Sequence, residues 1–296
     1  MRIKKYIFTL IIGIICFSFT SSDVSPFPFT NSSLLWKIES PTSKTSYLFG
    51  TMHIIEKEYF LFPKSLEKLV SKSDKLIMEL PGIPSPKEAL PLITLNKGSF
   101  FDFFNKEQTD SILNWANSEL KMNEQLFRSV FYKMKPFVVV QTAIQLQFQG
   151  KTESYEKSFY TLSNDKKIET IGLETVQQQM NFFDDLTKEE QAELVMESIR
   201  SPKKSIDLIN RMQKVYSRQN VDSLFLLFQE EGGALSKKQN QFLDDRNKNW
   251  IPKIKSNIST KNCFIAVGAG HLGGENGVIR LLQKGGYTLS PIQLEK

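Results

Sequence analysis

Residues 262–271 read NCFIAVGAGH, an apolar run that ends at a glycine and is followed three positions later by His271. Residues 46–53, SYLFGTMH, repeat this arrangement and end at His53. These are the only two histidines in the chain of 296 residues. A short apolar run bounded by glycine is typical of a buried strand, and glycine lets the backbone turn sharply without a clash from a Cβ atom. We therefore expect two strands whose histidines project from loops at the carboxyl ends, where α/β folds open their crevices.

Further strands and helices extend outward from the two histidine motifs. Each combines a periodic apolar pattern with turn or capping residues at its ends. The first elements expected are a hairpin of LLWKIES (34–40) and TSYLFGT (45–51), a helix over 64–71, and a strand in 74–82 that ends at Glu79. Next come a strand over 168–174 that ends at Glu174, and helices over 186–200, 205–215, 221–229 and 237–254. Capping boxes are expected at Thr175/Gln178 and Thr187/Glu190, and the last elements are a helix in NGVIRLLQK (276–284) and a strand in YTLSPI (287–292).

The middle of the chain, about 84–162, has the apolar spacing of helices and is expected to form a helical insertion. Its phenylalanines at 100, 101, 103 and 104 suit a hydrophobic core better than a substrate cleft. Strands separated by helices predict an α/β (α+β) fold, with a central mixed sheet and helices packed around it. We expect one domain over 33–296, preceded by a linker at 23–32.

The N-terminus resembles a secretory signal peptide. A basic start, MRIKK, is followed by an apolar run of 14 residues (6–19) and by small residues near Ser22. This run is short for a membrane span, which needs about 20 residues. We expect cleavage near Ser22 and export to a periplasm or the outside of the cell; a membrane anchor is the alternative if the segment stays uncleaved.

Charge and cysteine content narrow the range of partners. Of the formal net charge of +6, three positive charges lie in the predicted leader, so the remainder is too mildly basic to indicate nucleic acid. Cys263 would be the only cysteine after cleavage, so no internal disulfide is expected, and its place in an apolar run indicates a buried structural thiol. The sequence leaves the oligomeric state open.

The two histidines and the two strand-end acids form a candidate metal site. Two imidazoles with one or two carboxylates suit Zn²⁺, Mn²⁺ or Fe²⁺, with open positions for water and substrate. A bound ion of this kind lowers the pKa of its water and polarises a carbonyl. A histidine at a strand end is also often a hydrogen-bonded structural residue, and the residues alone leave both interpretations open.

Residues 268–273, GAGHLG, also match the G-x-G-x-x-G pattern of dinucleotide-binding proteins, with Glu295 near the distance of a ribose contact. Such a site needs further strands downstream to complete the nucleotide-binding half. Only one residue follows Glu295 in the sequence, so we expect no dinucleotide site.

The ordered set of motifs resembles the TraB/GumN family, which includes the TIKI metalloproteases. The resemblance extends over about 35–292 and is carried by YLFGTMH, IMELPG, SYEKSF, IGLETVQQQMNFF, DDRNKNW and FIAVGAGHLGGENGVIRLLQKGGYTLSPI. It implies a fold similar to the erythromycin-esterase and ChaN type. In the TIKI branch it implies a metal-dependent peptidase that uses two Gly-x-x-His motifs and an acidic residue.

The resemblance assigns His53, His271 and Glu79 as ligands of a divalent metal ion, which we expect to be Mn, Co or Zn. The implied function is an exported metal-dependent hydrolase, a peptidase of TIKI type in which a metal-bound water attacks a peptide or a small-molecule substrate. The alternative is a non-catalytic protein that sequesters a peptide or a haem-like ligand in the same cleft.

Four further residues occupy positions that match motifs of the family. Glu156 and Glu174 are candidates for assisting proton transfer, and Glu174 is also a candidate ligand or a partner behind the ligands. Arg246 and Asn247 match an Arg-Asn pair ahead of the last strand and are candidates for substrate binding. Arg246 suits a substrate carboxylate or an oxyanion because its planar fork binds either, and a structural ion pair with a nearby acid is the alternative.

Overall fold

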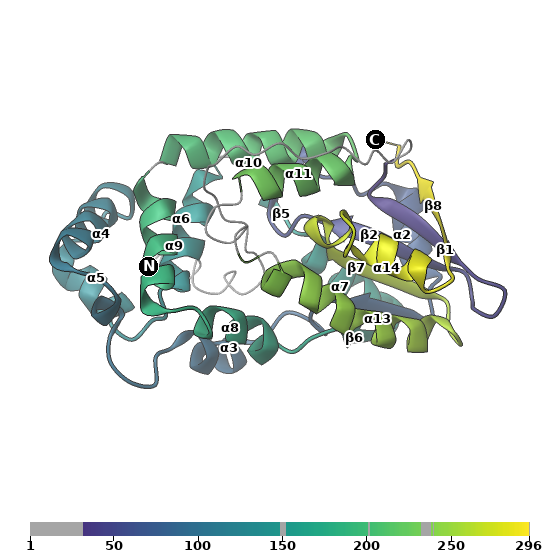
Figure 1. Cartoon of the computed structure of the whole chain (residues 1–296), viewed down its shortest axis with the longest axis horizontal. Coiled ribbons are helices and arrows are strands. Elements are labelled where there is room, and N and C mark those ends of the chain that lie inside the picture. Colours follow the sequence, from purple (N-terminus) through teal and green to yellow (C-terminus); the bar gives the residue numbers. More distant parts are fainter. Residues whose placement is uncertain (1–31, 149–151, 201, 232–237, 239, 296) are drawn as a thin grey trace.

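The computed structural model describes residues 32–148, 152–200, 202–231, 238 and 240–295. The predicted leader and the linker, apart from Ser32, lie outside these described residues. Figure 1 shows an elongated molecule with a sheet at one end and a group of helices at the other. Helices α10 (Pro202–Ser217) and α11 (Val221–Glu231) lie along one side between the two ends.

The central sheet has six strands in the order β6-β4-β7-β2-β1-β8. The strands are β1 (Leu35–Glu39), β2 (Ser46–Thr51), β4 (Lys75–Met78), β6 (Glu169–Gly172), β7 (Cys263–Gly268) and β8 (Thr288–Ile292). The first four in sheet order, β6, β4, β7 and β2, are mutually parallel. Strand β1 pairs antiparallel with both β2 and β8, which makes the sheet mixed. The predicted α/β fold with a central mixed sheet is therefore confirmed.

Strand β7 lies at the centre of the parallel part of the sheet, between β2 and β4. All six of its residues are buried, because its two neighbours cover its edges and helices cover both faces. A strand in this position reads as a continuous apolar run rather than an alternating one. The run CFIAV, which predicted a buried strand, fits this central position.

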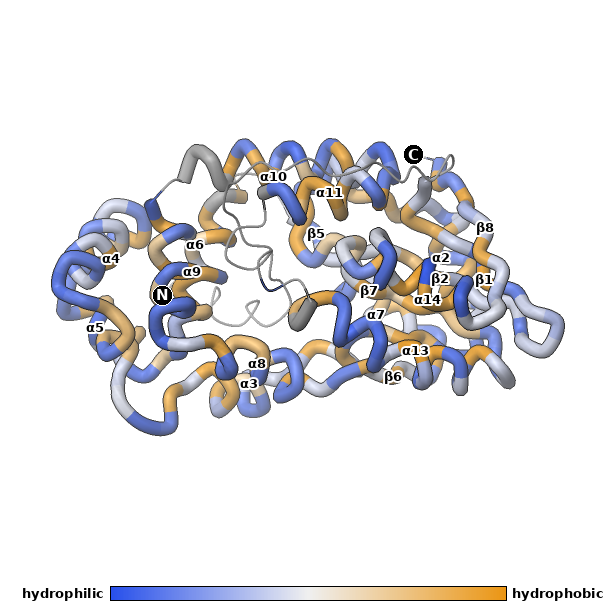
Figure 2. The backbone as a smooth tube through the Cα atoms, in the orientation of Figure 1, coloured by the Kyte–Doolittle hydropathy of each residue, from blue (hydrophilic) through white to orange (hydrophobic). Residues whose placement is uncertain are grey.

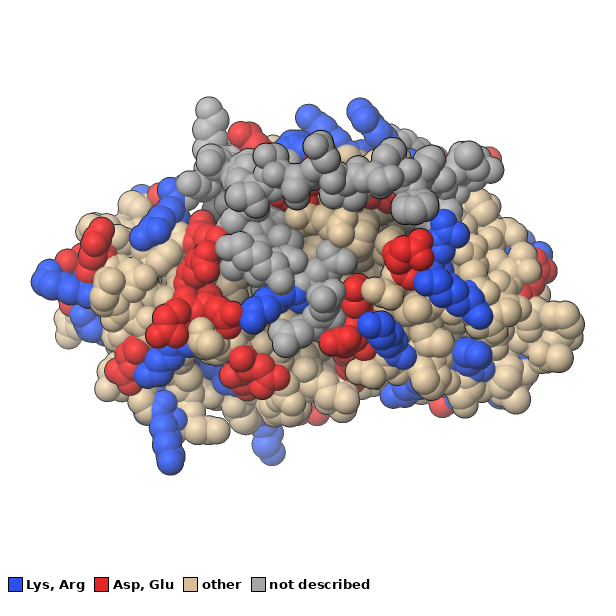
Figure 3. Space-filling view, viewed as in Figure 1, with Lys and Arg blue, Asp and Glu red and all other residues tan. Residues whose placement is uncertain are grey.

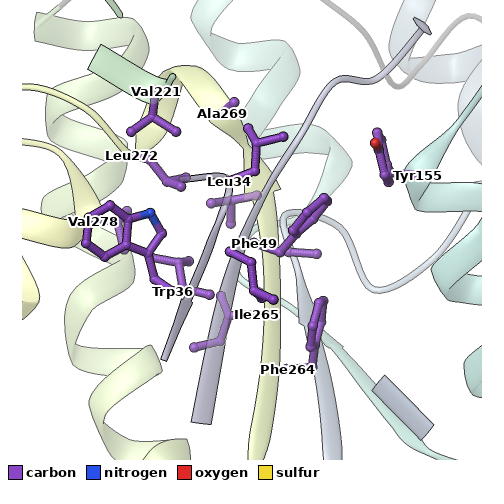
Figure 4. Packing of buried hydrophobic residues seen from close by; sticks show 14 of the residues in the cluster. Leu34, Trp36, Phe49, Tyr155, Val221, Phe264, Ile265, Ala269, Leu272 and Val278 are labelled. Carbon is purple, nitrogen blue, oxygen red and sulfur yellow. The ribbon is translucent and has the colours of Figure 1, made fainter. Parts of the chain in front are cut away.

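Helices pack on both faces of the sheet. Helices α2 (Lys64–Ser71) and α7 (Tyr155–Lys166) contact one another on one face, where the ring of Phe49 meets that of Phe159 edge to face at 5.7 Å. Helices α13 (Asp245–Ile258) and α14 (Val278–Lys284) contact one another on the other face. Figure 4 shows the division, with Trp36, Leu272 and Val278 on one side of the strands and Phe49 and Tyr155 on the other.

The opposite end of the molecule has its own hydrophobic core, built by helices from the predicted insertion and from the segment after β6. Its helices are α3 (Pro86–Ile93), α4 (Lys106–Glu119), α5 (Glu124–Phe131), α6 (Phe137–Gln147), α8 (Val176–Asp184) and α9 (Lys188–Arg200). Phe100 is fully buried in this core, and Phe101 and Phe104 pack against it, as predicted for these three; Phe103 is half-buried and contacts the ring of Phe104 instead. The tube in Figure 2 alternates between hydrophilic and hydrophobic along α10, as expected for helices with one face on a core.

Two local features differ from the sequence prediction. Strand β3 (Ile55–Glu56) pairs with β5 (Thr152–Glu153), and neither was predicted because two residues carry no periodic pattern. The helix predicted over 237–254 begins as a π-helical segment, η3 (Asn240–Asp244), and continues as α13 to Ile258, while 237 and 239 lie outside the described residues. A π-helical turn holds an extra residue and so re-aims the side chains that follow it; such turns are frequent at functional sites.

Among the described residues, no helix combines the length and apolar character that a membrane span requires. On the face drawn in Figure 3, basic and acidic side chains are interspersed over the helical end and the sheet end alike.

Candidate functional site

The four parallel strands each deliver one polar side chain to the same edge of the sheet. In sheet order, β6 is followed by Glu174, β4 by Glu79, β7 by His271 and β2 by His53. The pairing of Thr51 with Gly268 across β2 and β7 brings the two Gly-x-x-His motifs almost into register. Because parallel strands share their carboxyl edge, residues 53 and 271 meet despite their separation in sequence.

The two motif glycines provide space rather than an unusual backbone conformation. We expected each to allow a sharp turn, but neither has a positive φ, and Gly268 has φ −51° and ψ 135°. A Cβ on Gly50 would lie only 3.1 Å from the backbone of Ala269, and a Cβ on Gly268 would lie 3.2 Å from Glu79 Oε1. The two glycines therefore avoid a clash of a Cβ atom, as expected, and close approach by neighbouring atoms rather than a left-handed backbone explains both.

Arg246 links the strand-end residues through a network of short contacts. Its Nε donates to Glu174 Oε1 at 2.9 Å, and its Nη2 donates to Glu174 Oε2 at 2.8 Å and to Glu79 Oε2 at 2.7 Å. Its Nη1 lies 3.2 Å from Nε2 of His271. The three partners come from three adjacent strands, so one guanidinium ties β6, β4 and β7 together at their carboxyl ends.

The Glu79 carboxylate is stabilised in its ionised form. Its Oε1 accepts the N–H of Gly268 at 2.8 Å, and its Oε2 accepts the amide of Gln179 at 3.1 Å as well as Arg246. Burial alone raises the pKa of this carboxyl, but the Arg246 guanidinium, the two imidazoles and the backbone N–H outweigh it and hold the pKa at about 2. Glu79 therefore carries a full negative charge at neutral pH.

His53 pairs with Glu156 from the first turn of α7. The two are 2.8 Å apart between Nδ1 and Oε1, and Thr51 also donates to that oxygen, at 2.7 Å. Burial lowers the pKa of the His53 imidazole, but the Glu156 carboxylate raises this pKa by more than burial lowers it. The pKa therefore lies at about 9. His53 is therefore an imidazolium at neutral pH, and its second nitrogen, Nε2, faces the space beside Gly268.

His271 lies deeper in the protein and stays neutral. Its ring packs against Trp250 at 4.4 Å between ring centroids, and only 4% of the residue is exposed. Burial and the neighbouring Arg246 guanidinium lower its pKa to about 3. The two histidines of the chain thus differ in charge at neutral pH.

Asn247 fixes the tautomer of His271. Its amide nitrogen donates to two backbone carbonyls, those of Asn276 at 2.9 Å and His271 at 3.3 Å, so its oxygen is the atom that lies 2.7 Å from Nδ1 of His271. An amide oxygen only accepts, which places the imidazole proton on Nδ1 and leaves a lone pair on Nε2. This lone pair accepts from Arg246 and points toward Glu79.

The donor set of this edge suits a divalent metal ion. The Nε2 atom of His53, an edge carbon of the His271 ring and Oε1 of Glu79 lie 3.6, 3.5 and 3.2 Å from the point that a Cβ of Gly268 would occupy. Each imidazole is oriented through Nδ1 by an acceptor behind it, as is usual for metal-binding histidines. In the part of the chain that the structure describes, no three His, Cys, Asp or Glu side chains lie close enough to share an ion as they stand. Arg246, which contacts both His271 and Glu79, fills the intervening space.

A pocket with a volume of about 120 Å³ opens over the polar edge. One end is formed by the polar residues His53, Glu79, Arg246 and His271. The remaining walls are mostly apolar and include Leu80 and Met212 together with Phe182, Phe228 and Phe242 from the helical half of the molecule. Stacking of Phe228 on Phe242 and the contact of Phe182 with Phe242 make this wall a continuous aromatic surface.

The structure gathers all seven predicted site residues around one pocket, in two layers. His53, Glu79, Glu156, Arg246 and His271 line the pocket, whereas Glu174 and Asn247 do not. Both oxygens of Glu174 bind Arg246, and the Asn247 side chain, 1% exposed, holds His271.

Sequence reasoning missed Thr51, Gln179 and the aromatic wall. Thr51 immediately follows the first motif glycine, and Gln179 lies one turn into the helix that begins after Glu174. The capping box at Thr175/Gln178 was the available signal for Gln179, because it fixes where that helix begins and therefore which face looks back at the sheet.

A mixed sheet that collects paired histidines and acids at its parallel edge defines an α/β protein with a polar crevice at the strand ends. The chain belongs to the TraB/PrgY/gumN family, whose sequence model matches residues 34–291. Searches of curated proteins and of solved structures gave no match.

Proposed function

We propose that this protein is an exported metal-dependent hydrolase that acts on peptide bonds. The observation that supports it best is the meeting of His53, Glu79 and His271 from three adjacent parallel strands at one end of a pocket. These three side chains are the ones that would hold a divalent ion. When bound, the ion would supply a Lewis acid that polarises a substrate carbonyl and activates water.

The protein's own residues have separable tasks in this proposal. Glu156 orients the ring of His53 through its contact with Nδ1. The Glu156 carboxylate also lies where it would stabilise a proton that this ring releases. Asn247 keeps the lone pair of His271 directed at the pocket. Arg246 supplies a planar pair of donors suited to a carboxylate or to the oxyanion of a carbonyl under attack.

The shape of the pocket supports a substrate with an apolar group next to its reacting bond. Arg246 of the polar end and Phe242 of the aromatic wall lie next to one another, four residues apart in the same helical segment. Nη1 of Arg246 donates to the backbone carbonyl of Phe242 at 3.3 Å. A ligand held at Arg246 would therefore lay its neighbouring group against Phe242 and Phe228. An apolar cavity of about 150 Å³ in another protein binds benzene, so a volume of about 120 Å³ suits a side chain of similar or slightly smaller size.

The direct experiment is metal analysis of the purified protein. After incubation with Mn²⁺, Co²⁺ or Zn²⁺ and removal of free ions, the unaltered chain should retain one ion, and His53→Ala and His271→Ala should each retain far less. Glu275→Ala, which changes an exposed acid away from the pocket, serves as the control. Stoichiometric metal together with unchanged peptide cleavage in both histidine variants would refute the proposal.

A second candidate is a protein that sequesters a peptide or a haem-like ligand without cleaving it. The observation that favours it is the complete engagement of Arg246, Glu79 and Glu174 with one another, which leaves the apolar wall as the larger contact surface. This candidate predicts tight retention of ligand and no cleavage of a peptide library with any of the three metals. Absorbance in the Soret region of the purified protein would identify bound haem.

Export is proposed from the basic and apolar N-terminal segment of the sequence. The test is N-terminal sequencing of the protein recovered outside the cytoplasm, which should begin near residue 23. Recovery only in the membrane fraction with Met1 retained would favour the anchored alternative.

A further inference from the structure

Arg246 makes contacts that a bound metal ion would also require. Its Nη1 faces the Nε2 lone pair of His271 at 3.2 Å, and its Nη2 binds Oε2 of Glu79 at 2.7 Å. The same lone pair and the same carboxylate are two of the three donors in the proposed metal site. The single lone pair of His271 Nε2 cannot accept an N–H and bind a metal ion at the same time, and two cations close to the same carboxylate repel one another.

Glu174 gives Arg246 an anchor that does not depend on this space. It binds both Nε and Nη2 of the guanidinium in a bidentate arrangement, at 2.9 and 2.8 Å, and it does not line the pocket. Aromatic rings flank the guanidinium, with its Cζ at 5.0 Å from the ring centroid of Trp250 and at 5.7 Å from that of Phe242. The Arg246 side chain therefore keeps its ion pair with Glu174 and its contacts with two aromatic rings if it leaves His271 and Glu79.

We infer that Arg246 is an internal cation that holds the site in the metal-free protein and exchanges places with the incoming metal ion. Metal binding breaks its contacts with His271 and Glu79, while Glu174 retains it. The N–H groups of Nη1 and Nη2 that had faced His271 and Glu79 then become donors for a ligand carboxylate or oxyanion, while Nε and the other N–H of Nη2 stay on Glu174. This inference rests on the proposed metal site, and it makes Arg246 a positioning residue before metal binding and a ligand-binding residue after it.

The exchange has a consequence for affinity that can be measured without any substrate. In the unaltered protein a metal ion must displace the Arg246 guanidinium from Glu79 and His271, and this displacement lowers the affinity for the metal. Arg246→Met keeps an unbranched side chain but removes the competitor, and it leaves Glu79 and Glu174 as neighbouring carboxylates that attract a cation. We expect this variant to bind Mn²⁺ at least about tenfold more tightly.

The test measures Mn²⁺ dissociation constants by isothermal titration calorimetry on the full chain, with Arg246→Met compared with the unaltered protein. Arg128→Met is the matched control, because Arg128 forms an exposed ion pair with Glu124 on α5 and should leave Mn²⁺ binding unchanged. An equal or weaker affinity in Arg246→Met, with Mn²⁺ still bound by the unaltered protein, overturns the inference alone. Absence of metal binding in both proteins overturns the proposed metal site and the inference with it.

A second measurement covers the case in which Arg246→Met does not fold. In the ¹⁵N-labelled unaltered protein, the guanidinium signals of Arg246, assigned by their loss in Arg246→Lys, should shift when diamagnetic Zn²⁺ is added. Those of Arg128 should stay in place. Saturation with Zn²⁺ that leaves the Arg246 signals unmoved would show that no exchange occurs.

Discussion

The loops that carry His53 and His271 follow the same sequence pattern and leave adjacent parallel strands, yet the two imidazoles have opposite pKa shifts. The first ring has a carboxylate behind it, and its pKa is raised to about 9. The second has a neutral amide behind it and a guanidinium in front, and its pKa is lowered to about 3. The motif determines where each ring lies, and residues from other elements determine its charge.

This difference assigns the two rings distinct parts in one site. In the proposed metal site, His271 is neutral at any pH near neutral, so it needs to lose no proton before a cation replaces Arg246 at its lone pair. His53 would first have to lose a proton, so the proposed metal binding should depend on pH. Four predictions test or sharpen the contrast between the two loops.

The largest effect is expected from Glu156→Gln. Loss of the carboxylate leaves burial as the main influence on His53, so its pKa should fall from about 9 to 6.5 or below in metal-free protein. The chain has only two histidines, and their ring signals can be followed separately by NMR as the pH is varied. Glu119→Gln, an exposed position on α4, should leave both titrations unchanged. A His53 pKa that stays near 9 in Glu156→Gln would show that Glu156 is not the cause.

The second prediction concerns the stability of the metal-free protein between pH 6.5 and 9. The pKa of His53 in the folded protein lies above its unfolded value of 6.5. Protonated His53 therefore contributes to the free energy of unfolding fully below pH 6.5, and this contribution is lost as the pH rises through about 9. The loss should amount to about 3 kcal/mol, at about 1.4 kcal/mol for each pH unit between the two values. Glu79 and His271 do not change the stability between pH 6.5 and 9, because the lowered pKa values of both groups lie far below this range. Urea unfolding at a series of pH values should show the fall in the unaltered chain and little of it in His53→Gln.

The third prediction addresses the deeper ring. Asn247→Leu removes the acceptor of the Nδ1 proton of His271 and the donor to two buried carbonyls, which should cost about 2–3 kcal/mol in unfolding free energy. The control on the same helix is Asn249→Leu, which is exposed and should change stability by less than about 0.5 kcal/mol. Equal stability of the two variants would mean that Asn247 does not hold His271.

The smallest effect distinguishes the two motif glycines. Gly50→Ala places a methyl group 3.1 Å from backbone atoms that cannot easily move, and we expect a cost of about 1–2 kcal/mol. Gly268→Ala meets mainly the tip of the Glu79 side chain, at 3.2 Å, and should cost less than about 1 kcal/mol while shifting the NMR signals of both histidines. Thermal unfolding of the two variants measures the difference. A larger loss of thermal stability in Gly268→Ala than in Gly50→Ala would contradict this prediction.

The strands of the sheet were predictable because local sequence decides them. Apolar runs bounded by glycine, proline or an acid predicted β4, β6 and β7, and the turn PTSK predicted the hairpin of β1 and β2. The order of the strands was not predictable. Insertion of β7 between β2 and β4 depends on packing between segments about 190 and 220 residues apart, for which no single segment carries a signal.

The members of the site were more predictable than their contacts. Strand-end position and family resemblance identified His53, Glu79, Glu174 and His271 as neighbours. The sequence did not predict that Arg246 would bind three of them at once, because its direction is set by the π-helical segment before α13. Likewise, only the folded structure distinguishes the carboxylate behind one imidazole from the amide behind the other.

The central place of β7 also bears on the order in which the molecule can be assembled. Strands β2 and β4 touch only through β7, although they are formed from residues 46–51 and 75–78. During synthesis the ribosome completes both long before it reaches residue 263. The nascent chain must therefore keep a gap one strand wide in its sheet, with two unpaired edges that invite wrong partners. These two edges can pair as they do in the finished sheet only after the segment FIAVG has emerged and filled the gap.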